Sequence, residues 1–228
     1  MLIPSIDLMG GRIVQLVRGE KLKLAFDDFE YWIERFSTYP MVQLIDLDAA
    51  MRQGDNAALI EKIARRLPCQ IGGGISTLDR AKELLAMGAR RVIFGSALFR
   101  DTAEDSSVNL AFADAIKDQI GNEQFVASID TKAGRVAVKG WKEQVELTPQ
   151  QAIKALDPYC GAFLYTHVDT EGTMQGFPLE VARQLRELTS RQLIVAGGIR
   201  EQGEIDALHR IGVDAVAGMA VYTGALAT

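Results

Sequence analysis

Residues 5–13 read SIDLMGGRI, and residues 128–136 read SIDTKAGRV. Three further pairs recur in the same order, each copy 122 to 124 residues after its original: Gln53-Gly54 with Gln175-Gly176, Gly73-Gly74-Ile75 with Gly197-Gly198-Ile199, and Gly95-x-Ala97 with Gly218-x-Ala220. Four repeats in one order predict that the chain consists of two similar halves, about 1–122 and 123–228.

Short apolar runs alternate with amphipathic segments along both halves. Continuous apolar runs are typical of parallel strands that are buried on both faces. About eight strand-helix units would form either a closed barrel or an open doubly wound sheet, and two matching halves favour the barrel. We therefore predict one (β/α)8 TIM barrel domain over residues 1–228. The predicted strands are Leu2–Ile6, Val42–Leu47, Cys69–Ile71, Arg91–Phe94, Phe125–Ile129, Ala162–Tyr165, Leu193–Ala196 and Ala215–Ala217.

The composition is that of a globular protein. The 228 residues include 25 Lys and Arg against 30 Asp and Glu, for a net charge of -5, and 48% are hydrophobic. This balance disfavours disorder and nucleic-acid binding, and no apolar run reaches the roughly 18 residues of a membrane helix. Cys69 and Cys160 are too few for a disulfide scaffold. We expect a cytoplasmic monomer without nucleic-acid or membrane partners.

Glycine pairs follow the predicted strands of both halves. Bare backbone N–H groups at such turns can hold an anion, and a following helix adds its dipole. Tight strand-to-helix turns without a ligand are the alternative, but two symmetric sets favour two phosphate sites. The predicted phosphate-binding residues are Gly73, Gly74, Gly95 and Ser96 in the first half, and Gly197, Gly198, Gly218 and Met219 in the second.

Asp7 and Asp130 close equivalent apolar strands of the two halves. Active sites of (β/α)8 barrels lie at the carboxyl ends of the strands, so the two carboxylates are expected to face one another there. Two carboxyl groups in one cavity can serve as acid and base. The alternative is that they bind loop backbone, or Arg12 and Arg135.

Other polar residues have less specific patterns. Asp46 and Asp48, at the end of the second predicted strand, are expected to be structural. His167 and His209 are the only histidines, and no metal-binding spacing surrounds them. We therefore predict no metal site.

The motifs IPSIDL, LIDLDAA, IGGGI, VIFGSAL, SIDTKAGRVAVKGW and AGGI lie in the order found in one enzyme family. Over essentially its whole length the chain resembles the ProFAR isomerases of histidine biosynthesis. That resemblance implies a half-duplicated barrel and a substrate with two phosphates. It implies an aminoaldose-to-aminoketose (Amadori) isomerisation without metal or organic cofactor.

The resemblance also implies roles for matching residues. Asp7 would be the general base that removes the proton from ribose C2, and Asp130 the general acid that opens the ribose ring. Thr166 would hydrogen-bond the reacting ribose, and Trp141 would stack on the substrate from a mobile loop. Gly19 and Gly172 would join the phosphate glycines as substrate-binding residues.

Four positions depart from the family pattern. Gln15 and Met219 stand where a basic residue is usual, His167 replaces an acid, and Glu171 replaces Asp. Two alternatives stay open: an isomerase that also acts on phosphoribosylanthranilate, and an inactive phosphosugar-binding paralogue. The related glutamine-dependent cyclase is disfavoured, because Ser5 and Gln15 stand where it usually has Cys and Lys.

Overall fold

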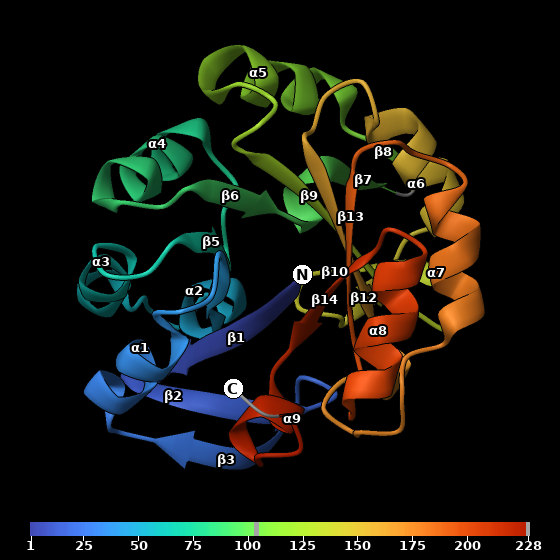
Figure 1. Ribbon diagram of the computed structural model, residues 1–228. Coiled ribbons are helices and arrows are strands. Elements are labelled where there is room, and N and C mark those ends of the chain that lie inside the picture. The colour runs from blue at the N-terminus through green and yellow to red at the C-terminus, as the bar shows by residue number, and fades with distance from the viewer. Residues whose placement is uncertain (103–104, 227–228) are drawn as a thin grey trace.

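The computed structural model describes residues 1–102 and 105–226, and in these ranges eight parallel strands close into a barrel (Figure 1). Strand β6 pairs with β9, and β14 pairs with β1, so the eight barrel strands form a closed ring. This confirms the predicted (β/α)8 fold. The barrel strands are β1 (Leu2–Met9), β4 (Val42–Asp46), β5 (Cys69–Gly72), β6 (Arg91–Phe94), β9 (Phe125–Lys132), β12 (Ala162–His167), β13 (Gln192–Ala196) and β14 (Asp214–Ala217).

Helices between the strands form the outer ring (Figure 1). Capping residues determine where these helices begin and end. Thr148 and Gln151 form a capping box at the start of α6, and Gly88 ends α4 in the left-handed conformation. None of the helices in the described ranges is long and apolar enough to cross a bilayer. The ring contains α1 (Phe29–Phe36), α3 (Ala57–Ala64), α4 (Leu78–Met87), α5 (Leu110–Ile120), α6 (Pro149–Leu156), α7 (Leu179–Arg186) and α8 (Gln202–Arg210); the short α2 (Leu47–Met51), α9 (Met219–Tyr222), η1 (Ser96–Leu98) and η2 (Val168–Thr170) follow strand ends.

The barrel strands are buried on both faces. The larger hydrophobic cluster lies between strands and helices and includes Phe94, Phe125 and Phe163. A smaller cluster, which includes Ile3 and Ile194, packs side chains from several barrel strands. Two apolar faces explain why these strands appear in the sequence as continuous apolar runs.

Hairpins extend the first strand of each half. Strand β2 (Arg12–Val17) pairs antiparallel with β1 and is followed by β3 (Lys21–Phe26). In the second half, β10 (Arg135–Val138) pairs with β9 and is followed by β11 (Glu143–Gln144). Strands β1 and β9 therefore run on to Met9 and Lys132, beyond their predicted ends. A third hairpin, β7 (Phe99–Thr102) with β8 (Asp105–Val108), precedes α5.

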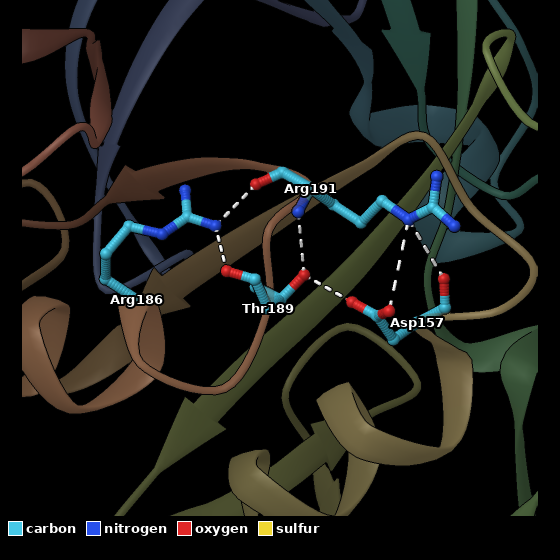
Figure 2. Close-up of polar contacts among 4 residues, drawn as sticks. All are labelled: Asp157, Arg186, Thr189 and Arg191. Atoms are coloured by element: carbon cyan, nitrogen blue, oxygen red, sulfur yellow. Dashed lines mark hydrogen bonds and ion pairs between the residues drawn. The ribbon is translucent and has the colours of Figure 1, made fainter.

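Asp157, Arg186, Thr189 and Arg191 form a polar cluster (Figure 2), and they precede β12 and β13, so the cluster lies at the amino-terminal ends of these strands. The Arg186 guanidinium donates to the carbonyls of Thr189 and Arg191. The Thr189 hydroxyl donates to Asp157, and Arg191 Nε lies 3.2 Å from the Asp157 carbonyl. These bonds join the loops that precede β12 and β13, so they serve the scaffold rather than the site.

Candidate active site

A cavity opens at the carboxyl ends of the barrel strands. Its walls come from both halves of the chain, because Trp141 follows β10 whereas Asp7 lies within β1. Asp130 borders the cavity through its contact with Trp141. Of the predicted site residues, the lining includes Asp7, Trp141, Thr166, Gly172, Gly197, Gly198, Gly218 and Met219.

Asp7 lies on β1 between β2 and β4. Burial raises the pKa of its carboxyl from 3.8 to about 6, although the Ser5 hydroxyl opposes this rise by donating to Oδ1 at 2.8 Å. Arg12 instead pairs with Asp27, so the alternative contact with Asp7 is not found. A carboxyl with a pKa near 6 can accept a proton at neutral pH.

Asp130 is the counterpart of Asp7 on β9. Ser128 Oγ donates to Oδ1 at 2.9 Å, and Trp141 Nε1 donates to Oδ2 at 2.7 Å. Thr166, which pairs with Asp130 in the register of β12 and β9, also hydrogen-bonds the carboxylate. Burial raises the pKa of Asp130, and these three donors oppose the rise. The second proposed contact, with Arg135, is absent because Arg135 pairs with Glu146.

Glu171 supplies a third carboxyl to the cavity. Burial raises its pKa from 4.5 to about 8, and the charges of Asp7 and Asp130 contribute to the rise. Its loop is held to the first half by the Arg18 N–H, which donates to the Glu171 carbonyl at 3.0 Å. The sequence pattern identifies Glu171 only as a replacement of Asp and predicts no role for it. Its position in the Glu-Gly-Thr loop after β12 was the available signal.

The second-half glycines line the cavity beside the carboxyls. A side chain at Gly197, whose φ is +114°, would place Cβ 2.4 Å from the His167 carbonyl oxygen. Close loop packing therefore requires glycine there whether or not a ligand binds. Gly198 and Gly218 are also in the lining, and Met219, next to Gly218, is buried.

The first-half glycines lie on the other side of the barrel mouth. They follow β5 and β6, which stand opposite β13 and β14 in the closed strand order. Cβ atoms at Gly73 and Gly74 would lie 2.2 Å and 2.4 Å from the carbonyl oxygens of Asp46 and Ala49. Gly73, Gly74, Gly95 and Ser96 are not among the residues that line the cavity beside Asp7.

Two further glycines of the predicted site contact neighbouring loops. Gly19 faces the ring of Trp141, and Gly172 faces the carbonyl of Leu16. Gln15 is buried and packs against Gly218. The described lining contains no Lys or Arg side chain, so a phosphate in this cavity would rely on neutral donors.

Asp46, Asp48 and His167 make local contacts. The Asp46 carboxylate accepts from the backbone and side-chain N–H groups of Asn56, both at 2.8 Å, and Asp48 also contacts the Asn56 amide. His167 Nδ1 lies 3.0 Å from Thr170 Oγ1. Within the described residues, His, Cys, Asp and Glu do not gather in any group of three or more that could hold a metal ion.

Comparison with known proteins identifies a family and relatives that share one name. The family described as "Histidine biosynthesis protein" matches residues 1–227. The chain is 33% identical to a protein of Methanocaldococcus jannaschii, over 98% of this chain and 94% of the relative. It is 31% identical to one of Methanococcus voltae, over 97% and 92%. Both relatives are named isomerases of 1-(5-phosphoribosyl)-5-((5-phosphoribosylamino)methylideneamino)imidazole-4-carboxamide, or ProFAR. The chain therefore belongs to the histidine biosynthesis protein family.

Proposed function

We propose that this protein is a ProFAR isomerase, which converts ProFAR to its phosphoribulosyl isomer. The observation that carries the proposal is the pair of carboxyls, Asp7 and Asp130, on equivalent strands of one barrel mouth, both with raised pKa values. The names of the relatives supply the substrate.

The two carboxyls have the chemistry that an Amadori rearrangement needs. Asp130 donates a proton to the ribose ring oxygen, and the ring opens to a protonated imine. The positive imine acidifies the neighbouring C2–H, and Asp7 removes that proton. Protonated Asp7 then returns a proton to C1 of the resulting enolamine, and the enolamine hydroxyl gives its proton to ionised Asp130 as the ketone forms, so both carboxyls regain their starting states. Substrate and product therefore have the same composition.

The surrounding residues would hold the substrate for these steps. The glycine turns of the two halves lie on opposite sides of the barrel mouth and would each take one phosphate through backbone N–H groups. Thr166, which is hydrogen-bonded to Asp130, would keep the reacting ribose beside the acid. Trp141 would stack on the substrate after leaving Asp130. Binding at both ends fixes the ribose between base and acid.

The test is to mix purified protein with ProFAR and follow the phosphoribulosyl isomer by chromatography. Turnover supports the proposal, and conversion of phosphoribosylanthranilate in a parallel reaction would extend it to two substrates. Tight binding of ProFAR without turnover would indicate the inactive paralogue. Neither binding nor turnover would reject ProFAR as the substrate.

A further inference from the structure

Gly19 and Trp141 make a close contact between the two halves of the chain. Gly19 lies between β2 and β3 with φ +71°. A Cβ added to Gly19 would lie 2.6 Å from Trp141 Cζ3 and 2.7 Å from Cε3. Real Cβ atoms do not approach other atoms so closely. The indole ring therefore rests on bare backbone, in a position that only glycine permits.

The other edge of the same ring covers Asp130. Trp141 Nε1 donates to Asp130 Oδ2 at 2.7 Å, while Ser128 Oγ donates to Oδ1 at 2.9 Å. Both carboxylate oxygens thus already have donors from the protein. While the indole ring lies against Oδ2, a substrate oxygen that approaches this lone pair meets the indole N–H instead.

The backbone that carries Trp141 is held in an unfavourable conformation. Lys139, Gly140 and Trp141 have φ values of +54°, +67° and +66°. Left-handed backbone is disfavoured for residues with a side chain and persists where surrounding contacts impose it. Here these contacts include those of the indole ring and the hydrogen bond from the Lys139 N–H to Ser96 Oγ, 2.8 Å long.

We propose that Gly19 is a positioning residue, which seats the Trp141 ring on Asp130 in the unliganded protein so that an incoming substrate must displace it. The geometry of the contact is independent of the reaction, whereas its effect on substrate rests on the proposed function. The contact between Gly19 and Trp141 connects the loop after β2 in the first half with Asp130 in the second half.

The contact can be tested with the full chain labelled with 5-fluorotryptophan, which gives two 19F resonances because the chain has 2 Trp. Trp141→Phe assigns them. Gly19→Ala should move the Trp141 resonance to the position of a solvent-exposed indole and leave that of Trp32 in place. Asp130→Ala, which removes the acceptor without touching Gly19, should also move it.

Gly11→Ala is the matched control. Gly11 lies in the turn between β1 and β2 with φ +74°, and a Cβ added there would have nothing within 4 Å, so alanine adds similar backbone strain but meets no ring. Both Trp resonances should stay in place. An unmoved Trp141 resonance in Gly19→Ala, or the same movement in Gly11→Ala, would overturn the proposal.

Kinetics give the second readout. If the contact between Gly19 and Trp141 holds a conformation that excludes substrate, Gly19→Ala should lower KM for ProFAR about 3- to 10-fold. This is the change expected when, in most of the wild-type protein, the indole lies on Asp130. The value of kcat should change less than KM. A raised KM or a lost kcat would overturn the proposed displacement. If wild-type protein neither binds nor converts ProFAR, the proposed function fails, but the NMR result still decides the contact.

Discussion

The change Ser5→Ala tests how the site adjusts the pKa of Asp7, the proposed base. The Ser5 hydroxyl donates to Asp7 Oδ1 at 2.8 Å and favours the ionised carboxylate. Alanine removes this donor and leaves the surrounding burial unchanged. The pKa of Asp7 should therefore rise above its present value of about 6.

The size of the effect follows from the hydrogen bond that is lost. A hydrogen bond to a charged group contributes about 1.5 kcal/mol, or about one pKa unit. At pH 6 the ionised fraction of Asp7 would fall from about one half to about one tenth, so kcat/KM should fall about fivefold. At pH 8 both forms are almost fully ionised, and the loss should be small.

The assay is kcat/KM for ProFAR from pH 5 to 9. The wild-type kcat/KM should rise as the pH increases through about 6, because Asp7, the proposed base, works in its ionised form. Ser5→Ala should move this rise to higher pH. Ser128→Ala is the control, because it removes the equivalent donor from Asp130 and should leave this rise in place. A rise that stays at about 6 in Ser5→Ala, or moves lower, would refute the reasoning.

Three further changes have defined outcomes. Glu171→Gln should raise the free energy of unfolding by an amount that grows from pH 4.5 to about pH 8 and then levels off, because the folded carboxyl holds its proton to about 8 whereas the unfolded one releases it near 4.5. Urea unfolding with an equal gain at pH 4 and pH 8 would contradict this. Gly197→Ala should lower the free energy of unfolding by about 2 to 4 kcal/mol, because its Cβ meets the His167 carbonyl. Gly203→Ala, with open space, should not, and equal losses in guanidinium titrations would count against the packing argument. Met219→Lys should lower KM for ProFAR about threefold at low salt by adding a cation to the cavity; no change in KM at any salt concentration would count against a phosphate at this position.

The strands could be predicted because each one is buried on both faces. Arg91–Phe94 agrees with β6 at both ends, since an apolar run in a barrel begins and ends with burial. The run Val42–Leu47 was one residue too long, because the Asp46 side chain caps α2 and so turns Leu47 into the helix. The hairpin strand β3 (Lys21–Phe26) was missed. It is half-exposed, and it exists through pairing with β2 rather than through its own apolar pattern.

The repeat placed Asp7 and Asp130 on equivalent strands, because a carboxylate that ends an apolar strand is conspicuous in a sequence. The sequence could not reveal that Gly19 seats Trp141, since the two residues meet only in the folded chain. The raised pKa of Glu171 likewise depends on three carboxyls from separate strands and loops. Glycine spacing alone also cannot separate phosphate binding from loop packing, because both require a missing side chain.

The most direct test of the central claim is turnover of ProFAR by Asp7→Asn and Asp130→Asn, with binding measured by calorimetry on the same samples. The account predicts that each change lowers kcat at least about 100-fold while the dissociation constant stays within a few fold, because the proposed acid–base help is lost but the proposed phosphate sites are unchanged. Turnover near the wild-type rate in either variant would contradict it.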